Sequence, residues 1–185
     1  MINSNLFLCG IKHCGKSSLG KVLAKAWNRP WFDADDLIRQ CLGPEVSIRT
    51  YYQKQGLRAF QSLECQTLEK ALNEARVFSI FSLGGGACDN PKLLEMVNGR
   101  GVSIYLRVSE QVLLKRIMKD GIPPFIDKED PQTSFAALYA RRDKLYGKKC
   151  AFVIDLPDYP TVEETSQFFI KYLEGVSDGP QQLRN

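Results

Sequence analysis

The residues best suited to chemistry in this chain form a glycine-rich loop near its N-terminus. Gly10 and the triplet Gly15-Lys16-Ser17 fit the pattern G-x-x-x-x-G-K-[ST], in which backbone amides bind phosphate oxygens. In such a loop the lysine places its charge on the β- and γ-phosphates, and the hydroxyl is a ligand for magnesium. The pattern therefore predicts binding of a nucleoside triphosphate with Mg²⁺, through the loop residues Gly10, Ile11, Lys12, His13, Cys14, Gly15, Lys16, Ser17 and Ser18.

The neighbouring sequence supports this interpretation of the loop. A short, wholly apolar run at residues 6–9 precedes it, as expected for a strand buried on both faces of a parallel sheet. An amphipathic pattern at residues 16–27 follows, which puts Gly15 at the start of a helix, where free amides favour an anion. His13 stands where many kinases of this type have glycine, and histidine tolerates a left-handed backbone. Whether its imidazole also touches phosphate stays open.

Two carboxylates follow the second predicted strand, at residues 30–32. Because ligands of open α/β sheets bind at the carboxyl edge, Asp33 and Asp35 are expected to face the same site as the loop. We assign Asp33 to the magnesium side and Asp35 to the hydroxyl that attacks the phosphate. Capping of the next helix is the alternative role for these acids, and it is compatible with catalysis.

A turn of three glycines and a pair of arginines complete the candidate site. Gly84, Gly85 and Gly86 follow the third predicted strand and leave backbone amides open to a ligand. Arg141 and Arg142 lie late in a predicted helix, and we expect at least one of them to face the phosphate loop or the substrate, where an arginine can clamp a carboxylate with two parallel hydrogen bonds. A solvated, charged helix end is the alternative for this pair. Arg116 is a candidate for the adenine face, with a plain surface charge as the alternative.

These elements, in this order, resemble the shikimate kinase family over residues 6 to about 173. Phe32-Asp33-Ala34-Asp35 is similar to the family's D-x-D motif, the three glycines to its glycine turn, and Arg142 with Leu145-Tyr146 to its R-x-x-L-Y segment. The resemblance implies ATP and Mg²⁺ as cofactors and transfer of the γ-phosphate to the 3-hydroxyl of shikimate. It also implies that Lys16 and Asp35 are catalytic, and that adenine lies between Arg116 and Pro160. The residues that the resemblance implies for binding of shikimate are Asp35, Gly84, Gly85, Gly86 and Arg142.

Two arginines of the family pattern are missing. Gln61 stands where the family usually has an arginine for the substrate carboxylate, and the lid, usually R-P-L-L, is here Ile122-Pro123-Pro124-Phe125. Arg58 lies one helical turn before Gln61, so we predict that it binds substrate in place of the missing side chain. Candidates for the missing charge of the lid are Lys119, Lys128 and Arg141.

Two other functions stay open. One is phosphorylation of a different small molecule, such as gluconate, a nucleotide or another hydroxy acid, by an enzyme of the same fold. The other is a catalytically weak homologue that binds nucleotide and has a regulatory role. The intact Lys16, Ser17, Asp33 and Asp35 argue against this last function, whereas the missing arginines argue for it.

Alternating strand and helix patterns predict a three-layer α/β/α fold with a five-stranded parallel sheet, the P-loop kinase fold with a mobile lid. A single domain is expected over residues 1–174, with the lid at about 119–133 and a disordered tail at 175–185. Strands are predicted at 6–9, 30–32, 78–82, 101–106 and 151–154, and helices at 16–27, 35–41, 47–56, 57–75, 91–98, 109–119, 135–148 and 161–174.

Composition narrows the class of protein. The chain has 185 residues, 44% of them hydrophobic and 25% charged, as in ordinary globular domains. A net charge of +4 suits a small anionic substrate, but there is no basic stripe with aromatics, so we expect no nucleic-acid partner. Six cysteines without C-x-x-C spacing favour reduced thiols in the cytoplasm, and no apolar run is long enough for a membrane span. We expect a cytoplasmic monomer.

Overall fold

The computed structural model describes residues 2–123 and 125–177. Its centre is a sheet of five parallel strands in the order β2-β3-β1-β4-β5. The strands are β1 (Asn5–Cys9), β2 (Trp31–Asp33), β3 (Ile80–Ser82), β4 (Gly101–Arg107) and β5 (Phe152–Asp155). The side chains from Leu6 to Cys9 in the central strand are completely buried, which confirms the sequence prediction for this run.

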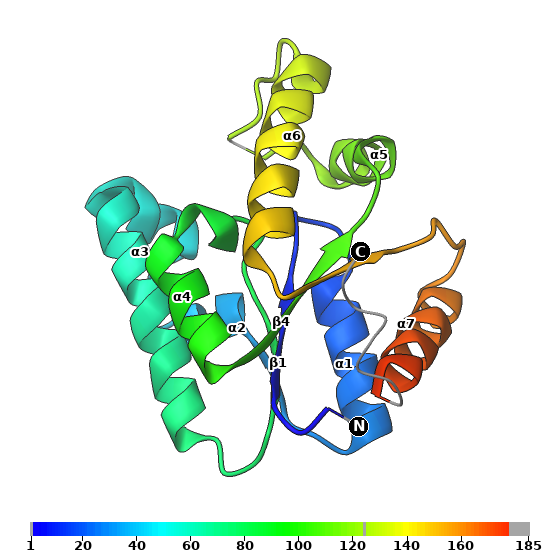
Figure 1. The fold of residues 1–185 in the computed structure, drawn as a ribbon. Helices are drawn as coiled ribbons and strands as arrows, with labels where there is room; N and C mark the ends of the chain where they lie inside the picture. The colour runs from blue at the N-terminus through cyan, green and yellow to red at the C-terminus, as the bar shows by residue number, and fades with distance from the viewer. Residues whose placement is uncertain (1, 124, 178–185) are drawn as a thin grey trace.

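Helices cover both faces of the sheet, so the predicted three-layer architecture is confirmed. Figure 1 shows α3 and α4 on one side and α1 and α7 on the other, while α5 and α6 extend past the edge at which the arrow of β4 points. The helices are α1 (Lys16–Trp27), α2 (Ala34–Leu42), α3 (Ile48–Glu74), α4 (Pro91–Arg100), α5 (Glu110–Asp120), α6 (Pro131–Lys149) and α7 (Val162–Ser177), with a 3₁₀ turn, η1, at Ala87–Asp89.

Local signals explain where several helices begin or bend. The two helices predicted at 47–56 and 57–75 form one element, α3, with a break at Gly56, whose φ is 79° and ψ 178°. Helix α6 begins at Pro131, earlier than the predicted residue 135, because Asp130 caps it by accepting from the Thr133 amide, and proline suits a first helical position.

The ends of the expected lid and tail also differ from the sequence prediction. Helix α5 reaches Asp120 and α6 begins at Pro131, so neither helix nor strand occupies the described residues between these helices. Helix α7 continues to Ser177, three residues into the range expected to be a disordered tail, and 178–185 lie outside the described residues. In the described chain no helix has the length and apolar character to cross a membrane.

Candidate active site

The loop between β1 and α1 has the backbone geometry that its sequence predicts. Gly10 and Gly15 have φ values of 145° and 99°, and His13 adopts the left-handed conformation with φ 67°. A Cβ at Gly10 would lie 2.9 Å from the Leu106 carbonyl oxygen, so only glycine fits there. Gly15 is the N-cap of α1 and has no side chain that could accept from the first amides of the helix. These amides are therefore available to an anion.

Lys16 lies at the centre of this loop and is buried. Its Nζ donates to the carbonyl oxygens of Gly10 at 2.8 Å and Ile11 at 3.1 Å. The carbonyls hold the ammonium group inside the loop, where a phosphate would be surrounded by amides. The loop therefore combines a fixed positive charge with oriented N–H groups.

Ser17 and Asp33 come together at the adjoining carboxyl edge of β2. The Ser17 hydroxyl donates to Asp33 Oδ2 at 2.6 Å, while Asp33 Oδ1 caps α2 by accepting from the Asp35 amide at 3.0 Å. The capping role considered for Asp33 is therefore present, whereas its magnesium role stays a prediction. A hydroxyl and a carboxylate are hard oxygen donors, which fit Mg²⁺. Among the described residues no cluster of three acids, cysteines or histidines forms a metal cage, so phosphate and water would supply the other ligands.

Asp35 and Glu64 lie on one side of the turn formed by Gly84, Gly85 and Gly86, which we call the glycine turn. A Cβ placed on Gly84 would be 3.5 Å from Asp35 Oδ1 and 3.6 Å from Glu64 Oε1. Burial, reinforced by the charge of Asp33, raises the pKa of Asp35. Burial also raises the pKa of Glu64 to about 7, against the hydrogen bond from Asn90 Nδ2 at 3.1 Å. This side of the turn is suited to accept a proton from a hydroxyl.

The raised pKa of Glu64 predicts a specific pH dependence of stability. Between its unfolded value of 4.5 and about 7, the folded chain keeps a proton that the unfolded chain releases, so stability falls as pH rises through this window. We expect Glu64→Gln, which keeps an acceptor for Asn90, to raise the free energy of unfolding by about 1–3 kcal/mol at pH 8 and by little at pH 4.5. Urea unfolding across this range measures the difference.

The matched control for this prediction is Glu69→Gln. Glu69 is an exposed carboxylate on the same helix, so its replacement removes a charge from α3 without changing the partly buried acids beside the glycine turn. An equal pH-dependent gain in both variants would show that the effect is general charge repulsion. A constant gain at all pH values would likewise contradict the assignment.

Gly85 joins the glycine turn to the phosphate loop. A Cβ at this position would lie 2.8 Å from the Lys12 backbone nitrogen and 3.1 Å from its Cα, closer than side chains approach backbone. We expect Gly85→Ala to displace the loop, because the added methyl group overpacks this contact at a cost of roughly 1–3 kcal/mol. Binding of a fluorescent ATP analogue should therefore weaken about tenfold. Gly99→Ala, at an exposed site on α4 with open space around its Cβ, is the control and should bind normally.

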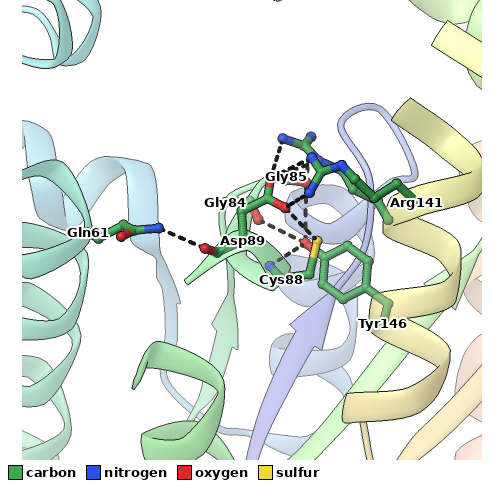
Figure 2. A network of polar contacts seen from close by, with 8 residues as sticks. Gln61, Gly84, Gly85, Cys88, Asp89, Arg141 and Tyr146 are labelled. Carbon is green, nitrogen blue, oxygen red and sulfur yellow. Dashed lines mark hydrogen bonds and ion pairs between the residues drawn. The ribbon is translucent and has the colours of Figure 1, made fainter. Parts of the chain in front are cut away.

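Arg142 lies on the other side of the glycine turn, and a Cβ at Gly86 would be 3.0 Å from its Nη2. The guanidinium is buried and donates from Nη1 to the Gly85 carbonyl at 3.1 Å, while the Tyr146 hydroxyl donates to the same carbonyl at 3.2 Å. Asp89 pairs with Arg142. Figure 2 shows Asp89 in the surrounding network with Gly85, Arg141 and Tyr146. The Phe125 ring of the expected lid lies 5.6 Å from the Arg142 guanidinium carbon. The lid thus contacts the predicted carboxylate-binding arginine.

Arg116 and Pro160 line one cavity of about 300 Å³ beside the phosphate loop, together with His13, Gly15 and Ser18. Arg116 Nη1 donates to the His13 carbonyl at 3.0 Å, which ties α5 to the loop. This cavity lies where the predicted adenine contacts place the base of the nucleotide.

The imidazole of His13 links the loop to the end of α5. His13 Nδ1 is 3.3 Å from Asp120 Oδ2, and its Nε2 is buried with no hydrogen-bond partner among the described residues. Burial and the charge of Lys12 lower its pKa despite Asp120. Its contact with phosphate stays a prediction.

One predicted residue is not part of this network. Arg58 is exposed and forms no hydrogen bond or ion pair within the described parts of the chain, so its binding role stays a prediction. Gln61, one turn later, instead donates from Nε2 to the Asp89 carbonyl at 2.7 Å. The sequence analysis missed Asp89 and Asn90 as neighbours of the site and gave no role to Glu64. It named Arg141 but not the pairing of Arg141 with Asp89. The signals available were the acid and amide directly after the glycine turn and the tandem of arginines.

Comparisons with known proteins identify the family and the fold of this chain. The family model described as Shikimate kinase matches residues 12–174. The chain is similar to shikimate kinase of Cupriavidus pinatubonensis, with 29% identity over 92% of this chain and 86% of that protein. It is also similar to shikimate kinase of Stenotrophomonas maltophilia, with 32% identity over 90% of this chain and 91% of that protein. Shikimate kinase from Acinetobacter baumannii in complex with shikimate has the same fold, with a TM-score of 0.80, 24% identity and 93% coverage of each chain. The chain therefore belongs to the shikimate kinase family.

Proposed function

We propose that this chain is a shikimate kinase, which transfers the γ-phosphate of ATP to the 3-hydroxyl of shikimate in the biosynthesis of chorismate and aromatic amino acids. Membership of the family and the relatives' names support this function. The observation that carries it is the glycine turn, which has carboxylates beside Gly84, the phosphate loop beside Gly85 and an arginine beside Gly86. A small ring with hydroxyls at one end and a carboxylate at the other fits this order.

In the proposed reaction, the nucleotide is held by the phosphate loop. Its amides and Lys16 would neutralise the β- and γ-phosphates, with the base in the cavity that Arg116 and Pro160 line. Ser17 and Asp33 would hold Mg²⁺, whose positive charge would offset the negative charge of the phosphates.

Asp35 would orient the 3-hydroxyl and accept its proton as the oxygen attacks phosphorus. Its raised pKa brings the carboxylate closer to the basicity that proton transfer near neutral pH requires. Arg142, Gly85 and Gly86 would fix the other end of the substrate, and closure of the lid would exclude water as a competing acceptor.

Isothermal titration and a coupled assay test the proposal together. We expect shikimate to bind in the presence of a non-hydrolysable ATP analogue, and ADP to be released when ATP and shikimate are combined. Gluconate and other hydroxy acids, assayed in parallel, should be poor acceptors. Faster phosphorylation of one of these acids, or no binding of shikimate with or without the analogue, would contradict the proposal.

A second candidate function, regulatory binding of nucleotide by a weak enzyme, is favoured by one specific feature. Gln61 is neutral, and its side chain is occupied by the Asp89 carbonyl, so it supplies no charge for a carboxylate. Tight ATP binding in the same titration without ADP release would support this function. The cytoplasmic location and the monomeric state stay predictions. Size-exclusion chromatography tests the monomeric state.

A further inference from the structure

Two consecutive arginines of α6 meet a single carboxylate at the end of η1. Arg142 donates to Asp89 Oδ2 from Nη2 at 2.9 Å and from Nε at 3.2 Å. Arg141 donates from Nη1 to Asp89 Oδ1 at 2.5 Å and from Nη2 to Oδ2 at 3.2 Å. Figure 2 shows Arg141 and Asp89 together on the arginine side of the glycine turn. Asp89 therefore fixes both guanidinium groups beside the turn.

The two arginines differ in what remains available to a ligand. The Arg142 side chain is 11% exposed and uses Nη1 on the Gly85 carbonyl as well as Nε and Nη2 on Asp89. The Arg141 side chain is 53% exposed, and within residues 2–123 and 125–177 Asp89 is its hydrogen-bond partner. Because a guanidinium carries five N–H donors, Arg141 keeps donors that face solvent while its position is held.

The charge of this cluster matches a single carboxylate. Burial opposes ionisation of Asp89, but the hydrogen bond from Arg141 and the charge of Arg142 hold the pKa of Asp89 below its usual value. Two guanidinium groups and one carboxylate leave one positive charge. Gln61 adds none, because its amide side chain is neutral and donates to the Asp89 backbone carbonyl. A ligand with one negative charge would therefore neutralise the cluster.

We propose that Arg141 binds the substrate carboxylate as the second cation of the site, held in place by Asp89. The proposal rests on the function proposed above, since it assigns a residue to recognition of the same acidic substrate. It places the second charge on α6, next to Arg142, and not on Arg58 of α3. Arg141 also lies outside the phosphate loop, so its contribution is to recognition of the acceptor.

Steady-state kinetics with each substrate varied separately test this assignment. We expect Arg141→Ala to raise KM for shikimate about tenfold or more, as loss of a charge-assisted hydrogen bond does, with KM for ATP and kcat nearly unchanged. Arg141→Lys keeps the positive charge but lacks the planar guanidinium that donates two parallel hydrogen bonds. Its KM for shikimate should lie between those of the parent and the alanine variant. The control is Lys144→Ala, which removes an exposed charge from the same helix and should leave KM unchanged.

The methyl ester of shikimate separates a direct contact from a structural effect. Because the ester lacks the negative charge, Arg141→Ala should lower kcat/KM for shikimate but not for the ester. Equal losses for both compounds would overturn the proposal, as would an unchanged KM in Arg141→Ala together with a raised KM in Arg58→Ala. A parent protein that does not phosphorylate shikimate would instead refute the proposed function, and this inference with it.

Discussion

We expect Lys16→Ala to lower kcat for phosphorylation of shikimate by about 10²–10³-fold, the effect of removing one preorganised charge from a transition state. The Lys16 ammonium is buried and held by the carbonyls of Gly10 and Ile11, so in the proposed reaction it would act on the phosphate with little entropic cost of ordering. The charge on the γ-phosphate oxygens must be neutralised as the bond to the leaving group breaks. A coupled assay at saturating ATP measures kcat.

The control for this variant is Lys25→Ala, which removes an exposed lysine from the same helix, α1. Thermal unfolding of both variants shows whether the loop still folds, because Lys16 also bonds two loop carbonyls. A folded Lys16→Ala protein that kept more than a tenth of the parent kcat would contradict the role given to this lysine.

The fold could be predicted from the sequence because the patterns that specify its elements are local. A strand buried on both faces has a continuous apolar sequence, and residues 6–9 have such a sequence in β1. The break at Gly56 was also predicted, as a boundary between two helices, although the chain continues as one kinked element. The start of α6 was missed although its signals, Asp130 and Pro131, are local as well, since the hydrophobic pattern becomes clear only from Phe135.

The candidate site was predictable to the extent that its motifs are contiguous. The phosphate loop, the acids after β2 and the glycine turn all follow strands, so parallel topology brings them to one edge. The pairing of Asp89 with Arg141 and Arg142 joins positions 52 and 53 residues apart, and no local pattern reports which acid meets which arginine. The same holds for Glu64, whose pKa depends on burial beneath the turn.

The three glycines divide the proposed site by charge. Beside Gly84, half-buried acids with raised pKa values favour neutral, hydroxyl-bearing groups, whereas beside Gly86 the cluster of two arginines and Asp89 favours an anion. This separation of charge would orient the proposed substrate by electrostatics before any close contact forms. The hydroxyl end would then point toward Asp35.

The second large effect is expected for Asp35→Asn, which should lower kcat about 10²–10⁴-fold because the amide cannot accept the proton of the 3-hydroxyl. The same change should not lower stability at neutral pH, since burial and the charge of Asp33 disfavour the ionised form of Asp35 in the folded chain. In the parent, activity should fall as pH drops through the pKa of Asp35, and the variant should lose this acid limb of the pH profile.

Asp36→Asn, which removes the exposed carboxylate that pairs with Arg39 on the same helix, is the control and should keep the parent kcat. Loss of activity together with a lower unfolding temperature in Asp35→Asn would show that Asp35 supports the structure. A fall of activity at low pH that persists in Asp35→Asn would show that another group takes the proton.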